Sequence, residues 1–316
     1  MTREESHNLM SKLLSEQTPL EFVADTLKNL AKQLPTPTEL LGFLDGLLDA
    51  AVPLKSFVAL DLCGTGGDGK NTFNISTAAA FVLSAMDVPV AKHGNSASSS
   101  KCGSSDVLKA LGVQLPTTSD EVDRQFKRTN LVFLHAPYFH PALKRLAPVR
   151  KELGIKTIFN LLGPLANPVK PIYQLIGVAN PDLMEVYSTV LNELRREFLV
   201  VHTKGGYDEI TLTGESLLRT GIFRTVLDIS DFNLESTILP EELQGGENPE
   251  ENAKIIRLLL EGEGTTAQNY VVAANAAAAA NLYFNDKSYA TLFQEALTTI
   301  RSKAALEKLE LVCQPF

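Results

Sequence analysis

The sequence is poor in cysteine and contains only Cys63, Cys102 and Cys313. Three cysteines cannot all pair and none stands in a C-x-x-C motif, so neither a disulfide framework nor a zinc site is expected. Long hydrophobic runs are also missing. The richest, residues 271–280, is short, dominated by alanine and broken by Asn275, whereas a membrane helix needs about 20 apolar residues. The opening segment MTREESHNLM has no apolar core of a secretory signal. We therefore expect a cytoplasmic protein without a membrane partner.

Positive charge is in short supply as well. Lys and Arg total 29 against 37 Asp and Glu, which gives a net charge of −8 over 316 residues. An acidic chain without a basic tract is a poor candidate for general nucleic-acid binding. A highly phosphorylated ligand would therefore have to be held by local donors and a metal ion. The content of 44% hydrophobic and 21% charged residues is that of a folded globular protein, and the length suits about two domains.

Residues 1–55 carry helical signals and no strand signal. Apolar side chains recur at helical spacing, as they do in residues 40–48. The segment TPTE at 36–39 has the features of a helix start: a cap threonine, a proline at the first helical position and a glutamate three residues after the cap. The segment TPLE at 18–21 repeats this pattern. The sequence predicts a small all-α domain here.

Residues 56–316 have a different character, because short apolar runs alternate with helical patterns. We predict strands over residues 57–63, 88–95, 131–136, 157–162, 173–179, 198–203 and 209–214. Alternation of strands and helices favours an α/β domain with a central, largely parallel sheet flanked by helices. From residue 249 onward the pattern is helical again, and the alanine-rich segment 273–280 is typical of a tightly packed helix.

Two loops that follow predicted strands could bind phosphate. The first, DLCGTGGDG at 61–69, is rich in glycine and precedes a helix that starts near Ser76. Glycines let backbone N–H groups approach an anion, and the helix N-terminus adds further donors. The second, residues 92–104, offers two lysines and several hydroxyls. Each loop alone could be an ordinary strand–helix connection or a solvated turn. Together, at one sheet edge, they suit a ligand with two phosphate groups.

Other candidate groups are acidic or cationic. Asp208 and Glu209 are adjacent carboxylates at a predicted strand edge and are suitable ligands for Mg²⁺. A solvated turn is the alternative interpretation of this pair. Arg150 could bind a carboxylate through two donors, although a surface arginine beside Lys144 and Arg145 would look the same. No Ser-His-Asp triad stands out.

Taken in order, several motifs resemble the anthranilate phosphoribosyltransferase family. They are GTGGD (64–68), NIST (74–77), KHGN (92–95), SSKCGSSDVLKALG (99–112), VRKELGIKTIFNLLGPLANP (149–168), LQGGENPEENAKII (243–256) and NAAAAANLY (275–283). The resemblance implies a nucleoside phosphorylase-like fold, in which a small all-α domain, residues 1–55 with a helical segment within about 140–170, joins an α/β domain. It also implies a homodimer that forms through the helical domain.

The same resemblance implies an activity. A phosphoribosyl group would pass from phosphoribosyl pyrophosphate to the amine of anthranilate, with release of pyrophosphate, in tryptophan biosynthesis. The anthranilate amine is a weak base and already neutral near physiological pH, so no dedicated catalytic base is expected. The protein would act by positioning and charge stabilisation.

The resemblance assigns site residues as follows. The phosphoribosyl pyrophosphate site takes Gly64, Gly67, Asp68, Thr72, Asn74, Ile75, Ser76, Thr77, Lys92, His93, Gly94, Asn95, Ser99, Ser100 and Ser104. The anthranilate site takes Gly64, His93, Asn95, His140, Arg150 and Gly163. Two Mg²⁺ ions are expected at Ser76, Asp208 and Glu209.

The chain departs from the family pattern at two positions and leaves two alternatives to weigh. Ser96 stands where the family commonly has Arg, and Thr203 stands where it usually has Gly. A pyrimidine nucleoside phosphorylase is one alternative, but phosphorolysis has no use for Asp208, Glu209 and Arg150. A non-catalytic nucleic-acid-binding paralogue is the other, and the net charge of −8 argues against it.

Overall fold

The computed structural model describes residues 1–96 and 102–316 and contains one seven-stranded sheet, with the strand order β3-β2-β1-β4-β5-β6-β7. Its parallel part is formed by β1 (Leu60–Gly64), β2 (Val90–Gly94), β3 (Leu131–His135), β4 (Tyr173–Gly177) and β5 (Glu197–Thr203). The last two strands, β6 (Ser216–Thr220) and β7 (Phe223–Leu227), are antiparallel. The predicted α/β class with a largely parallel sheet is confirmed.

Strand β1 lies where the winding of the sheet reverses, because β2 pairs with one of its edges and β4 with the other. Gly64 and Gly177 are register partners at the carboxyl ends of β1 and β4. In open α/β sheets, ligands bind in the crevice outside the carboxyl ends of the strands at such a reversal. The topology therefore points to the loops after β1 and β2.

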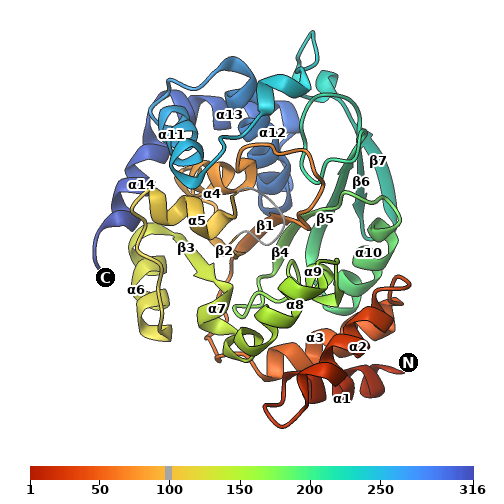
Figure 1. Cartoon of the computed structure of the whole chain (residues 1–316). Coiled ribbons are helices and arrows are strands. Elements are labelled where there is room, and N and C mark those ends of the chain that lie inside the picture. The colour runs from red at the N-terminus through yellow and green to blue at the C-terminus, as the bar shows by residue number, and fades with distance from the viewer. Residues whose placement is uncertain (97–101) are drawn as a thin grey trace.

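One face of the sheet is covered by the C-terminal helices, which lie at the top and left in Figure 1. The C-terminal helices are α11 (Pro249–Leu260), α12 (Thr266–Tyr283), α13 (Tyr289–Arg301) and α14 (Ala304–Cys313). They share a hydrophobic cluster with the sheet and with two helices from earlier in the chain, α4 (Ile75–Ala85) and α5 (Ser104–Ala110). Residues 273–280 of α12 are all buried, as predicted for a tightly packed helix. Alanine suits this position because it lets neighbouring elements approach closely.

The other face packs against a second cluster. Its helices are α1 (Arg3–Leu14), α2 (Leu20–Leu30), α3 (Pro37–Asp49), α8 (Ala147–Leu153), α9 (Ile158–Leu162) and α10 (Leu183–Glu193). Near β3 a smaller cluster includes α6 (Ser119–Thr129) and α7 (Ala136–Phe139), and the 3₁₀ helices are η1 (Pro141–Leu146), η2 (Ile229–Phe232) and η3 (Pro240–Leu243). The N-terminal helices thus share a core with residues 146–166, while the division of the chain at residue 55 stays a prediction.

The two predicted helix starts differ. At Thr36 the hydroxyl accepts the Glu39 N–H at 3.3 Å and the Glu39 carboxylate accepts the Thr36 N–H at 2.8 Å, so this capping box is confirmed. At Thr18 the hydroxyl instead donates to the Lys12 carbonyl at 2.5 Å, and α2 begins without a side-chain cap. The predicted capping box there is wrong, because Thr18 closes the turn between α1 and α2.

Two predicted strands are also wrong. Residues 157–162 form α9, whose first turn is closed by the Thr157 N–H donating to Asn160 Oδ1 at 2.9 Å. Residues 209–214 form an irregular segment, because the N–H and C=O of Ile210 bond the side chain of Asn275 at 3.1 and 2.7 Å instead of a neighbouring strand. The strands that follow β5 lie further along, at β6 and β7.

A search of the helices in residues 1–96 and 102–316 finds none that combines the length and the hydropathy needed to cross a membrane.

Candidate active site

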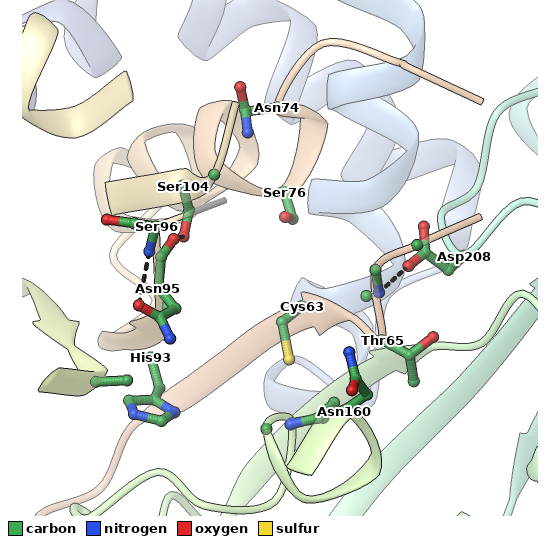
Figure 2. A pocket seen from close by; sticks show the side chains of 18 of the residues that line it. Cys63, Thr65, Asn74, Ser76, His93, Asn95, Ser96, Ser104, Asn160 and Asp208 are labelled. Carbon is green, nitrogen blue, oxygen red and sulfur yellow. Dashed lines mark hydrogen bonds between the residues drawn. The ribbon is translucent and has the colours of Figure 1, made fainter. Parts of the chain in front are cut away.

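A cleft of about 350 Å³ opens at the carboxyl ends of β1 and β2. The loops after these strands, the segment that contains α8 and α9, and residues 208–209 line it. Figure 2 shows Asn95 and Ser104 on one side of the hollow, Asp208 on the other, and Cys63 and Ser76 between them. The reversal of the sheet at β1 therefore coincides with this cleft.

Most residues that the sequence singles out meet in this cleft. Those that line it are Gly64, Gly67, Asp68, Thr72, Asn74, Ser76, Thr77, Lys92, His93, Gly94, Asn95, Ser104, His140, Arg150, Gly163, Asp208 and Glu209. Ile75 does not face the cleft; its side chain is buried in the core beneath α4. Ser99 and Ser100 lie outside the described residues. The individual roles assigned to these side chains remain predictions.

The glycine-rich loop after β1 needs its glycines. Gly66, Gly67 and Gly69 have φ values of 71°, 68° and 73°, in the left-handed region that side chains other than glycine disfavour. A Cβ at Gly64 would lie 2.2 Å from Asp208 Oδ2. The same carboxylate oxygen accepts the Gly66 N–H at 2.6 Å. The loop is therefore shaped around Asp208, with its backbone close to the cleft.

Glu209 joins Asp208 at this edge, and its Oε1 accepts the Ser76 N–H at the start of α4 at 2.9 Å. Burial and the neighbouring Asp68 raise the pKa of Asp208 above its usual range. Burial and Asp208 raise the pKa of Glu209 in the same way. Two carboxylates held together away from water favour a nearby cation, which would relieve their repulsion.

The donor set fits Mg²⁺. Asp208, Glu209 and the Ser76 hydroxyl all line the cleft and offer hard oxygen ligands. In residues 1–96 and 102–316 there is no cluster of three or more His, Cys, Asp or Glu side chains that could hold a metal by themselves. Mg²⁺ is commonly bound by one or two carboxylates together with substrate phosphates and water, so this arrangement suits a metal that is bound together with a phosphorylated ligand.

Lys92 supplies positive charge from β2 beneath the glycine-rich loop. Its Nζ donates to the Leu62 carbonyl at 2.5 Å and to Ser76 Oγ at 3.2 Å. Asp61 lies nearby, and burial raises the pKa of its carboxyl group to about 6, against the opposing charge of Lys92. The Asp61 carboxylate also accepts the His93 N–H at 3.2 Å and the Asn167 amide at 2.9 Å. The end of β2 is thus fixed from two sides.

The described ends of the second loop are drawn together. The Asn95 carbonyl accepts the Ser105 N–H at 3.1 Å and the Ser104 hydroxyl at 3.4 Å. A Cβ at Gly94 would lie 2.2 Å from Ser104 Oγ, so glycine permits this close approach. Asn95 and Ser104 both line the cleft as a result.

A more aromatic compartment adjoins the phosphate loops. The rings of His93 and His140 meet edge to face, with centroids 5.4 Å apart. Burial lowers the pKa of His93 to about 3 and also lowers that of His140, so both rings are neutral. His93 Nε2 and His140 Nδ1 are buried and find no hydrogen-bond partner within the described part of the chain.

Arg150 completes this compartment from α8. Its guanidinium lies over the ring of Phe159 at 5.3 Å, and burial lowers its pKa from the usual value. An arginine is still charged under these conditions. A planar guanidinium that stacks on an aromatic ring and lines a cleft is well placed to bind a carboxylate through two donors.

Several lining residues were not predicted as site residues, among them Leu47, Cys63, Thr65, Asn160 and Asn252. Asn160 lies within the family-like motif 149–168, so its position was recognisable from the sequence even though its role was not. Leu47 belongs to α3 and Asn252 to α11, far along the chain from the loops. Asn252 lies within the motif 243–256, whereas no motif marks Leu47, and the packing of the helices brings both to the cleft.

Comparison with known proteins first identifies the general class of protein to which the chain belongs. Residues 56–306 match the family described as "Glycosyl transferase family, a/b domain". The chain is therefore a glycosyl transferase of this α/β type.

Individual relatives narrow the class. The chain is 41% identical over 309 residues to anthranilate phosphoribosyltransferase from Cytophaga hutchinsonii, with 97% of this chain and 94% of that protein covered. It is 42% identical to the Bacteroides thetaiotaomicron enzyme, over 85% of this chain and 82% of that protein. The chain belongs to the anthranilate phosphoribosyltransferase family.

Solved structures agree. The anthranilate phosphoribosyltransferase of Thermus thermophilus superimposes with a TM-score of 0.92 at 36% identity, over 99% of this chain and 95% of that one. The Saccharomyces cerevisiae enzyme in complex with PRPP and Mg has a TM-score of 0.89 at 26% identity, over 98% and 92%. These similarities favour the transferase over the two alternatives weighed from the sequence.

Proposed function

We propose that this protein transfers the phosphoribosyl group of 5-phosphoribosyl 1-pyrophosphate to the amine of anthranilate, giving N-(5-phosphoribosyl)anthranilate and pyrophosphate in tryptophan biosynthesis. The observation that carries the proposal is the single cleft that joins two phosphate-type loops, the carboxylate pair Asp208 and Glu209, and the compartment around Arg150. One part suits a polyphosphate and the adjoining part suits a small aromatic acid.

The reaction places defined demands on the cleft. The bond between the anomeric carbon and the pyrophosphate oxygen breaks, and its electron pair leaves with pyrophosphate. The amine lone pair forms the new carbon–nitrogen bond, and the nitrogen then releases a proton to water. Positive charge develops on the sugar ring and negative charge on the leaving group, so positioning and charge stabilisation supply the rate acceleration.

The residues of the two loops bind the donor substrate. Backbone N–H groups of the glycine-rich loop suit the pyrophosphate group, whereas the Ser76 N–H at the start of α4 is already bonded to Glu209. Lys92 adds a cation, and Ser104 adds a hydroxyl from the second loop. Ser76, Asp208 and Glu209 would hold Mg²⁺, which when bound neutralises charge on the pyrophosphate leaving group. We propose two ions, because the pyrophosphate and the two carboxylates together carry several negative charges.

The acceptor compartment orients anthranilate. Arg150 pairs with the carboxylate, Asn95 contacts the ring substituents, and His93 and His140 line the remaining wall with Gly163. The neutral imidazoles add no charge that would compete with Arg150. None of these groups has to act as a strong base, because the amine attacks in its neutral form.

The decisive experiment follows the loss of anthranilate fluorescence on addition of phosphoribosyl pyrophosphate, with and without Mg²⁺. Turnover that depends on both is the expected result. Parallel assays of pyrimidine nucleoside phosphorolysis and of salt-sensitive DNA binding test the two alternatives. Absence of anthranilate consumption, together with either of those activities, would overturn the proposal.

We also propose a cytoplasmic homodimer that forms through the helical domain, residues 1–55, which the segment 140–170 completes. Exposed apolar side chains on and near α2, namely Leu20, Phe22 and Leu34, support such a contact. Light scattering on the purified protein measures the oligomeric state directly, and a charge substitution at Phe22 should yield the monomer. A monomeric wild-type protein at micromolar concentration would contradict the dimer.

A further inference from the structure

Thr203 is the last residue of β5 and is fully buried, although its side chain carries a hydroxyl. That hydroxyl donates to the backbone carbonyl of Glu209 at 2.7 Å, and it lies 2.6 Å from the hydroxyl of Ser216 at the start of β6. A threonine hydroxyl has a single proton, which the Glu209 carbonyl receives, so Ser216 is the donor in the second bond. The three residues are linked by two successive hydrogen bonds, from Ser216 to Thr203 and from Thr203 to Glu209.

These two hydrogen bonds close the turn that carries the carboxylate pair. Between Thr203 and Glu209 the backbone makes a tight turn, in which Gly205 and Gly206 adopt the left-handed region at φ 93° and 87°. The Thr203 N–H donates to the Tyr207 carbonyl at 3.2 Å, and the hydroxyl bond then ties Thr203 to residue 209. Thr203 therefore holds the turn through two bonds, one to Tyr207 and one to Glu209.

The backbone immediately after Glu209 is fixed from the opposite side. Asn275 on α12 bonds both the N–H and the C=O of Ile210, at 3.1 and 2.7 Å. The peptide between Glu209 and Ile210 is therefore clamped between β5 and α12. With its backbone held in this way, the Glu209 carboxylate reaches the Ser76 N–H at 2.9 Å, where it lines the cleft.

We propose that Thr203 and Ser216 are positioning residues for the cation site: together they set the backbone of Glu209, and through it the carboxylate that binds Mg²⁺ with pyrophosphate. Neither side chain lines the cleft, so neither contacts a substrate. The inference rests on the function proposed above. Groups that orient a metal ligand from behind commonly change metal affinity or activity about 10- to 100-fold when they are removed.

The experiment uses the full-length protein, four single variants and one double variant. Thr203→Val removes the hydroxyl with little change of shape, Thr203→Ser keeps it, and Ser216→Ala removes the donor behind it. Thr211→Val is the matched control, because Thr211 is equally buried, lies two residues after Glu209 and bonds the Thr213 hydroxyl at 2.8 Å instead of the Glu209 backbone. Two readouts are needed: binding of Mg²⁺ in the presence of pyrophosphate by calorimetry, and steady-state kinetics at several Mg²⁺ concentrations.

The expected result is an apparent Mg²⁺ affinity about tenfold weaker in Thr203→Val, with an anthranilate KM within about twofold of wild type. Thr203→Ser should restore the affinity and Thr211→Val should keep it. Because Thr203 and Ser216 act through successive hydrogen bonds, the double variant Thr203→Val/Ser216→Ala should bind Mg²⁺ no more weakly than the more affected single variant.

Either of two outcomes overturns the inference. One is a Thr203→Val protein with the Mg²⁺ affinity of wild type, even if its melting temperature falls, because that is what a purely structural hydroxyl would do. The other is equal weakening in Thr203→Val and Thr211→Val. A wild-type protein that binds no Mg²⁺ with pyrophosphate and transfers nothing to anthranilate would instead refute the proposed function.

Discussion

Replacing Gly177 by alanine should displace the residues that line the cleft, although Gly177 itself does not contact a substrate. It ends β4, directly beside Gly64 of β1. A Cβ at this position would lie 1.6 Å from the Asp208 carbonyl oxygen and 2.4 Å from its carbonyl carbon. Real Cβ atoms are essentially never closer than 3.0 Å to such a neighbour, so the backbone of residue 208 would have to move by about 1.4 Å (3.0 − 1.6 Å).

This movement cannot be absorbed by a flexible side chain, because the obstructing atoms belong to the backbone that carries both carboxylates. A displacement of about 1 Å in a positioned group costs on the order of 10²-fold in rate. Gly177→Ala should therefore lower kcat/KM by at least about 100-fold in the anthranilate fluorescence assay. It should also lower the free energy of unfolding by about 1–3 kcal/mol, as measured in urea, because the added methyl group overpacks the site.

Gly214→Ala provides the control for Gly177→Ala. Gly214 lies on the segment that follows the carboxylate pair, and a Cβ there would meet only Lys204 Cβ at 3.9 Å, an ordinary contact. Its kcat/KM should stay within about threefold of wild type. A folded Gly177→Ala protein that kept kcat/KM within the same limit would refute the reasoning, since the carboxylates would then tolerate the displacement.

Four further changes have defined outcomes. Arg150→Ala should raise the anthranilate KM about 10- to 100-fold and leave that of phosphoribosyl pyrophosphate within about threefold; an unchanged anthranilate KM in initial-rate measurements contradicts the assignment. Asp208→Asn/Glu209→Gln should abolish Mg²⁺-dependent turnover, and full activity of this double variant would remove the metal role. Asn275→Ala leaves the buried peptide groups that it bonds unpaired, which should cost about 2–4 kcal/mol in urea unfolding; unaltered stability would count against the clamp. Burial lowers the pKa of His135 to about 4 from 6.5, so below pH 6.5 the unfolded imidazole takes up a proton that the folded one resists. The melting temperature of wild type should therefore fall more steeply between pH 6.5 and 4.5 than that of His135→Phe, and parallel curves would disprove this.

The parts of the fold that the sequence predicted are those encoded locally. The Thr36 capping box and the parallel strands from β1 to β5 follow from spacing and turn residues. Residues 157–162 were misassigned because a short apolar run has no periodicity that separates a buried helix from a buried strand. Residues 209–214 were misassigned because the backbone of Ile210 bonds the side chain of Asn275, 65 positions away along the chain.

The site shows the same division between local and long-range information. Glycine-rich loops and adjacent carboxylates are local patterns, and the structure brings them to one cleft. Leu47 reaches that cleft only through the packing of α3 and has no local motif that marks it. Asn252 lies within the motif 243–256, but only the packing of α11 shows that it lines the cleft. Thr203 was noticed as a departure from the family pattern, but its contact with Glu209 depends on the course of a turn. Propensity and spacing contain no information of that kind.

The acidic composition of the chain has a counterpart inside the cleft. A cleft lined with lysines would attract any polyanion, nucleic acid included, since a positive field does not discriminate among phosphates. Here Asp208 and Glu209 lie beside the glycine-rich loop. Burial raises the pKa of both, and the neighbouring charge of Asp68 raises that of Asp208 further, as Asp208 does for Glu209. A bare phosphate ligand would add to that repulsion, whereas a phosphate that arrives with a divalent cation relieves it. The carboxylate pair therefore suits a phosphate ligand that brings a divalent cation with it better than it suits a metal-free polyanion.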